Sequence, residues 1–207
     1  MTGSDRYQCY ADLARHEHEH CDYRRLLRIR PGRFAIIAPH GGGIEPGTSE
    51  IAQLIAGDEF SLYCFEGLKS RRNYPTLHIT SDRFDEPMCL ELLTHVQTVV
   101  AVHGCNVRDE VIFVGGRDTT LKDRIITMIG TTGIAAKEHP GFSGIPPNNI
   151  CNRGRSGQGV QLEVSLGLRR RMLEHLMYDR RRITPMLEQF VEAIRSVLLR
   201  TAKEVGR

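Results

Sequence analysis

Two histidines and one glutamate lie beside apolar segments of this 207-residue chain, and together they could bind a metal ion. His40 ends the apolar run 34–39 and is followed by three glycines and then Glu45, and His103 ends the apolar run 99–102. Two histidines and one glutamate are the protein ligands of hydrolytic zinc sites that keep a fourth position for water. We therefore predict that these three residues bind one Zn²⁺ ion.

The three glycines that follow His40 indicate a sharp bend or a close backbone contact. Glycine loses more backbone entropy on folding than any other residue, so three in a row are unfavourable inside a helix or strand. A bend at this point would let His40 and Glu45 converge. A structural interpretation stays open, in which His103 is a hydrogen-bonded core histidine and Glu45 faces solvent from a turn. The glycines favour the metal site.

Glu163 is the candidate for the group that accepts and returns a proton during hydrolysis. Residues 160–164 alternate between apolar and polar side chains, which predicts a strand with Glu163 on its polar face. The alternative is a glutamate on an edge strand that faces solvent.

Arg117, Asn152 and Arg153 are the candidates for binding a carboxylate of the substrate. They lie in glycine-rich segments that follow predicted strands. A guanidinium group can hold a carboxylate through two parallel hydrogen bonds. The alternative is that each is an exposed loop residue.

Two other motifs compete with this site. Residues 16–20 satisfy the H-E-x-x-H zinc signature, but charged residues surround them, which favours a solvated helix. Residues 40–43 match the His-Gly-Gly-Gly oxyanion loop of lipase-like hydrolases, which also require a G-x-S-x-G motif. The nearest segments, 141–144 and 154–157, do not have that spacing. Neither motif replaces the predicted metal site.

The elements that position these residues follow from the hydrophobic pattern and from capping signals. Strands are predicted at residues 34–39, 60–65, 76–80, 99–103, 111–114, 134–137 and 160–164. Helices are predicted at residues 48–57, 88–94, 119–129, 166–178 and 185–203, and in the polar lead-in 7–30. This alternation predicts one three-layer α/β domain over residues 1–207, with an open, mostly parallel mixed sheet and helices on both faces. Residues 1–20 form a lead-in segment of this domain.

Composition limits the possible partners and location. The net charge is +3, so bulk charge does not indicate a nucleic-acid partner. No apolar run approaches the roughly 20 residues that span a bilayer, which predicts no membrane partner. The first residues contain no secretory signal, and the six cysteines form no C-x-x-C pair, so we expect a cytoplasmic protein.

Six sequence blocks resemble the poly-γ-glutamate hydrolase family of bacteriophages and bacteria. The blocks are APHGGGIEPGT at 38–48, FEGLK at 65–69, LHITS at 77–81, HG at 103–104, VGG at 114–116 and GVQLE at 159–163. The similarity extends from about residue 22 to residue 170, with all blocks in order.

This resemblance implies a zinc-carboxypeptidase-like fold in which His40, Glu45 and His103 bind zinc and Glu163 acts as base and acid. The near ligand pair here is H-x-x-x-x-E, whereas the zinc carboxypeptidases have H-x-x-E, which places the chain with the phage hydrolases. Asn152 and Arg153 resemble the carboxypeptidase pair that holds a terminal carboxylate.

The function implied is zinc-dependent hydrolysis of γ-glutamyl amide bonds in poly-γ-glutamate or a related acidic peptide. One alternative is a zinc peptidase or amidase that acts on cell-wall or other γ-glutamyl peptides. The other is a non-catalytic metal-binding module that kept the fold.

Overall fold

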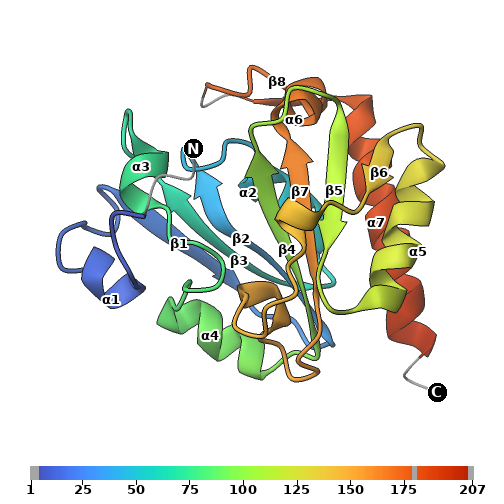
Figure 1. Cartoon of the computed structure of the whole chain (residues 1–207), viewed down its shortest axis with the longest axis horizontal. Helices are drawn as coiled ribbons and strands as arrows, with labels where there is room; N and C mark the ends of the chain where they lie inside the picture. The colour runs from blue at the N-terminus through green and yellow to red at the C-terminus, as the bar shows by residue number, and fades with distance from the viewer. Residues whose placement is uncertain (1–4, 179–180, 205–207) are drawn as a thin grey trace.

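A seven-stranded mixed sheet forms the middle layer of the computed structural model, which describes residues 5–178 and 181–204 (Figure 1). The strands are β1 (Tyr23–Arg28), β2 (Phe34–Gly42), β3 (Ser61–Gly67), β4 (Thr98–Cys105), β5 (Val111–Gly115), β6 (Ala135–Lys137) and β7 (Val160–Ser165). Their order across the sheet is β1-β3-β2-β4-β7-β5-β6. The central strands β3, β2, β4 and β7 are parallel, whereas β1 runs antiparallel to β3, and β5 runs antiparallel to β7.

Helices cover both faces of this sheet. The α-helices are α1 (Tyr10–Leu13), α2 (Thr48–Ala56), α3 (Asn73–Leu77), α4 (Pro87–Thr94), α5 (Thr119–Gly130), α6 (Leu166–Met172) and α7 (Pro185–Glu204). Two 3₁₀ turns, η1 (Pro140–Phe142) and η2 (Ile150–Asn152), interrupt the long loop before β7, and β8 (Leu173–Glu174) pairs with β9 (Arg182–Ile183). Helices α2, α5, α6 and α7 bury one face of the sheet, and α1, α3 and α4 lie on the other (Figure 1).

The alternation of side chains along each strand produces the two hydrophobic cores. In β2, Phe34 and Ile36 belong to the core under α2 and α7, while Ala35 and Ile37 belong to the core under α4. Because both faces are covered, the central strands are continuous apolar runs. The prediction of a single α/β domain with a mixed, mostly parallel sheet is confirmed. Within the described ranges, no helix is long and apolar enough to cross a membrane.

Three predicted elements differ from the structure. The lead-in 7–30 is not one helix but the short α1 followed by β1, an edge strand whose charged side chains hid its alternation. Residues 76–80 are not a strand, because α3 extends to Leu77 with Pro75 in its first turn, where a missing N–H is tolerated. The helix predicted at 166–178 ends at Met172, because the following residues pair with β9.

The glycine bend after His40 has the predicted form. The chain leaves β2 with Gly42 in the left-handed region at φ 61°, and the N–H of Glu45 then donates to the carbonyl of His40 at 2.8 Å. A Cβ atom on Gly42 would lie 2.6 Å from the carbonyl oxygen of Gly67 in β3. The bend therefore requires glycine both for its dihedral angles and for the close approach of β3.

We expect Gly42→Ala to destabilise the protein by about 2–4 kcal/mol, because alanine is strained at this φ and its Cβ meets backbone rather than a movable side chain. Urea unfolding of the metal-free protein measures this change. Gly130→Ala is the matched control, since nothing lies within 4 Å of a Cβ at that helical position. The control should change stability by less than about 1 kcal/mol, and equal effects of the two substitutions would refute the steric explanation.

Candidate metal and catalytic site

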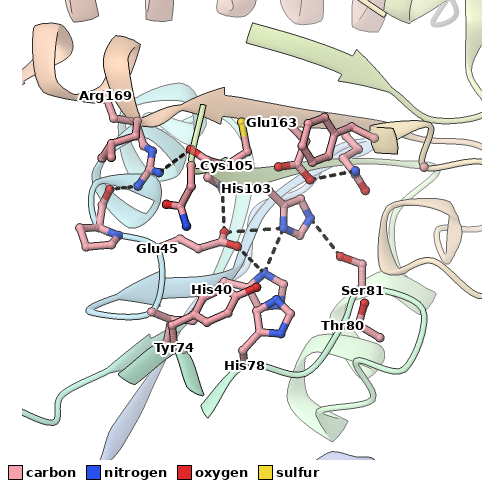
Figure 2. Close-up of a pocket in the computed structure, with 18 of the residues that line it drawn as sticks. His40, Glu45, Tyr74, His78, Thr80, Ser81, His103, Cys105, Glu163 and Arg169 are labelled. Carbon is pink, nitrogen blue, oxygen red and sulfur yellow. Dashed lines mark hydrogen bonds and ion pairs between the residues drawn. The ribbon is translucent and has the colours of Figure 1, made fainter. Parts of the chain in front are cut away.

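A pocket of about 840 Å³ lies where the C-terminal ends of β2, β4 and β7 meet. Ligands of open α/β sheets bind at this edge. His40 comes from β2, His103 from β4 and Glu163 from β7, and Glu45 follows the glycine bend (Figure 2). The pocket thus contains all three predicted metal ligands and the predicted base.

The donor atoms of His40, Glu45 and His103 point toward one another (Figure 2). Nδ1 of His40 lies 3.1 Å from Nδ1 of His103 and 3.3 Å from Oε1 of Glu45. Nδ1 of His103 lies 3.9 Å from Oε2 of Glu45. Ligand bonds of 2.0–2.1 Å at a tetrahedral zinc ion place two ligand atoms about 3.3 Å apart. The spacing of the three donors fits such an ion.

The electrostatics of these three residues also favour a cation. Burial lowers the pKa of His103 to about 3, with a further contribution from His40. Burial opposes the charged forms of His40 and Glu45 as well, but their mutual attraction outweighs it, so the pKa of His40 is raised and that of Glu45 is lowered to about 2. The buried carboxylate of Glu45 and the nitrogen atoms of the two histidines therefore form a site that attracts positive charge.

Backbone groups hold two of these side chains in place. Nε2 of His40 donates to the carbonyl of Ile79 at 2.8 Å, which directs Nδ1 into the pocket. The N–H of Gly104 donates to Oε2 of Glu45 at 2.8 Å. Partners of this kind fix the tautomer and orientation of metal ligands.

Glu163 lies beside His103 because the two residues are directly paired in the parallel register of β4 and β7. Its Oε1 accepts a hydrogen bond from Nε2 of Gln161 at 3.0 Å, and Asn149 donates to Gln161 at 3.1 Å. Burial, together with the nearby charge of Glu45, raises the pKa of Glu163 to about 8. The side chain is therefore a buried carboxyl group able to exchange a proton near neutral pH.

Arg169 closes one wall of the pocket and was not predicted from the sequence. Its guanidinium donates to the carbonyls of Val164, Pro46 and Cys105, and only 2% of the residue is exposed. It therefore links the end of β7, the turn after Glu45 and the end of β4. Arg170 also lines the pocket and is exposed.

The structure does not bring the three predicted substrate-binding residues into this pocket. β5 runs antiparallel to β7. Arg117, which follows β5, is therefore exposed near the N-terminal ends of the parallel strands, away from the pocket. Arg153 is exposed in a segment whose backbone N–H groups donate to carbonyls just before β4. It therefore also lies near the N-terminal ends of the parallel strands. Asn152 is buried, and its amide bonds the backbone of the loop at Gly144, Pro146 and Gly159.

The H-E-x-x-H segment is a turn rather than the solvated helix we predicted, because α1 ends at Leu13. His16 and His20 are exposed. Glu17 is buried, where it accepts from the Tyr7 hydroxyl and pairs with Lys69. The motif holds the N-terminal region against the domain.

His78 forms part of the pocket wall and offers a second possible ligand set. It can join His40 and Glu45 with all three donor atoms within 4.8 Å of one another. Its ring, however, packs against that of His40 with centroids 4.1 Å apart and planes tilted by 34°, and its Nδ1 bonds to Asp5 at 2.7 Å. The set that contains His103 has donor separations of 3.1–3.9 Å, measured to the two oxygens of Glu45, and it is the set that the sequence predicts. The sequence signal for His78 was its place in the LHITS block.

The same fold occurs in solved structures of related proteins. A bacteriophage poly-γ-glutamate hydrolase is 32% identical and superposes with a TM-score of 0.92 over 96% of this chain and 98% of that one. A zinc-free apo form of YndL is 33% identical, with a TM-score of 0.90 over 95% of this chain and 98% of that one.

Sequence comparison identifies the family. The protein YndL of Bacillus subtilis (strain 168) is 36% identical over 93% of this chain and 76% of its own length, and YmaC of the same organism is 36% identical over 94% and 84%. The family model described as poly-gamma-glutamate hydrolase matches residues 7–193. The chain belongs to the poly-γ-glutamate hydrolase family, which confirms the predicted resemblance and the prediction that the chain is an enzyme.

Proposed function

We propose that this chain is a zinc-dependent hydrolase that cleaves γ-glutamyl amide bonds in poly-γ-glutamate or a related acidic peptide. The observation that carries the proposal is the convergence of His40, Glu45 and His103 within 3.1–3.9 Å of one another beside the buried Glu163. Family membership and the zinc-free form of YndL support zinc as the metal.

His40, Glu45 and His103 would hold the ion through Nδ1, a carboxylate oxygen and Nδ1. When bound, zinc lowers the pKa of its water toward 7 and polarises the scissile carbonyl. The ligands contribute two neutral nitrogens and one carboxylate, so the site keeps a net positive charge for an oxygen nucleophile.

Glu163 would accept a proton from the attacking water and deliver it to the leaving amine. The hydrogen bond from Gln161 occupies Oε1, which leaves Oε2 to carry the proton. Asn149 in turn orients the Gln161 amide, so the carboxyl is held by a chain of two amides. This arrangement fixes the direction of proton transfer at the end of β7.

An exposed arginine at the pocket supports an acidic substrate. Arg170 lines the pocket, and its exposed guanidinium can reach a substrate carboxylate at the pocket mouth. We infer that Arg170 takes the role that the sequence suggested for Arg117 and Arg153.

The test is hydrolysis of poly-γ-glutamate by the zinc-loaded protein, followed by the fall in polymer length. We expect cleavage that a chelator stops and added zinc restores. A panel of γ-linked and α-linked glutamyl peptides then defines the bond, with cleavage of the γ-linked set expected. A zinc-loaded protein that leaves the polymer and all γ-linked peptides intact would refute the proposal.

A further inference from the structure

The segment 78–81 contacts the imidazole rings of both proposed histidine ligands. The His78 ring packs against the His40 ring at a tilt, and the Ile79 carbonyl accepts the hydrogen bond from Nε2 of His40. Oγ of Ser81 lies 3.4 Å from Nε2 of His103 (Figure 2). The position of this one segment therefore determines how both rings are oriented.

No helix or strand holds residues 78–80, which follow the C-terminal end of α3. Their place in the molecule must come from other contacts. The buried Ile79 side chain and the hydrogen bond from the Ile150 N–H to the Ser81 carbonyl at 2.9 Å are two of them, and a carboxylate from the N-terminal region supplies three more hydrogen bonds. Oδ1 of Asp5 accepts from Nδ1 of His78 at 2.7 Å, and Oδ2 accepts from the N–H of Thr80 at 2.7 Å and from Arg83 at 2.5 Å.

The Asp5 carboxylate is buried, with 6% of its side chain exposed. Burial opposes its ionisation, but the hydrogen bonds from His78 and Thr80 outweigh that effect, so the pKa of Asp5 lies below its ordinary value. An ionised carboxylate with several donors in a buried position makes strong, directional contacts. Its removal would leave buried donors unpaired and free the segment to move.

We propose that Asp5 is a positioning residue of the metal site, which fixes the rings of His40 and His103 by holding segment 78–81. The inference rests on the proposed zinc site and adds a partner distant in the sequence. Asp5 touches neither the ligands nor the pocket, so its effect passes through His78, Thr80 and their neighbours. Outer partners of metal ligands change metal affinity by about 10–100-fold when removed.

The experiment measures the zinc dissociation constant of Asp5→Ala by competition with a chromophoric chelator. We expect a Kd about 10–100-fold higher than that of the wild type. Asp5→Asn keeps the size and one acceptor oxygen, so it should fold as the wild type does, with a smaller loss of affinity. The cobalt(II) spectrum of Asp5→Asn provides a second readout, and we expect shifted absorption bands because the ring orientations change.

Two control variants separate positioning of the ligands from general loosening of the N-terminal region. Asp85→Ala removes the carboxylate that accepts from the Tyr10 N–H, a second attachment of this region, and Arg83→Gln removes an ion pair of Asp5 but keeps its bonds to His78 and Thr80. Both should keep the wild-type Kd within about threefold. Urea unfolding of the metal-free variants shows whether each one folds.

Wild-type zinc affinity and an unshifted cobalt spectrum in both Asp5 variants would overturn the inference. An equal loss of affinity in Asp85→Ala would also overturn it, because the effect would then be general. Failure of the proposed function is distinct: a wild type that binds zinc but cleaves no glutamyl bond leaves the Asp5 result intact. A wild type that binds no zinc overturns both.

Discussion

Glu163→Gln is expected to lower kcat/KM for γ-glutamyl hydrolysis by about 10²–10⁴-fold while zinc stays bound. Glutamine has the shape of the protonated glutamate and can accept the hydrogen bond from Gln161, so the pocket should keep its form. It cannot take a proton from water or return one to the leaving amine. The steady-state rate on a γ-linked glutamyl peptide, measured beside the zinc content, tests this prediction.

Glu138→Gln is the matched control for this substitution. Glu138 is an exposed carboxylate that pairs with Lys122 outside the pocket, so its loss should leave the rate unchanged. A Glu163→Gln enzyme with a rate near that of the wild type would show that another group moves the proton. A loss of zinc in the same variant would show that the side chain supports the metal site rather than the proton transfer.

Glu163→Gln, which should lower the activity, should raise the free energy of unfolding of the metal-free protein. The pKa of Glu163 is about 8 in the folded chain, against an ordinary value of 4.5, because the carboxyl is buried near Glu45. Between these pH values the folded protein holds a proton that the unfolded chain releases, so wild-type stability falls as pH rises. Glutamine does not titrate, and Glu163→Gln should exceed the wild type in free energy of unfolding by about 4 kcal/mol at pH 8.

Urea unfolding of both metal-free proteins between pH 5 and pH 8 measures this difference. The two proteins share the other titrating groups of the pocket, so the difference between them reports Glu163 together with its coupling to Glu45 and His40. It should be small near pH 5 and grow toward pH 8. A constant difference across this range would mean that Glu163 is already ionised in the folded metal-free protein.

The residues that we propose as metal ligands and base could be singled out in the sequence because most of their signals are local. Buried parallel strands are continuous apolar runs, and in β2 and β4 each run leads directly into a histidine. The glycines then show where the backbone bends. Because β4 and β7 are parallel neighbours, the predicted strand of Glu163 ends at the same edge, and the register sets it opposite His103.

Whether a loop residue such as Arg117 lies at the pocket could not be predicted in the same way, because strand direction is not a local property. A loop after a strand lies at the ligand-binding edge only if the strand is parallel to its neighbours. β5 is antiparallel to β7, and nothing within the sequence of β5 reports this. Arg117 therefore follows a strand, as predicted, but it lies at the N-terminal ends of the parallel strands, away from the pocket.

The surroundings of the ligands depend on contacts between residues far apart in the sequence. Asp5 meets His78 across 73 positions, and Arg169 bonds the Pro46 carbonyl across 123. Neither residue belongs to a periodic pattern, and each is an ordinary charged side chain when read alone. Only the folded chain shows that Asp5 and Arg169 are buried beside the pocket.

His103→Ala is expected to weaken zinc binding by more than about 100-fold, because it removes a ligand, whereas loss of an outer partner costs about 10–100-fold. His78→Ala provides the decisive comparison, since His78 belongs to the alternative set with His40 and Glu45. We expect His78→Ala to retain zinc after purification, with a higher Kd, and His103→Ala to be purified without it. Metal analysis and chelator competition measure both.

The exposed His95 serves as the control for these substitutions, because it lies outside the pocket and pairs only with Glu91 on the surface of α4. His95→Ala should bind zinc as the wild type does. If His78→Ala loses the metal and His103→Ala keeps it, the ion is held by His40, Glu45 and His78, and His103 is a core histidine beside the base. The wild-type donor separations of 3.1–3.9 Å favour the first result, since one ion can reach His40, Glu45 and His103 without a change in the backbone.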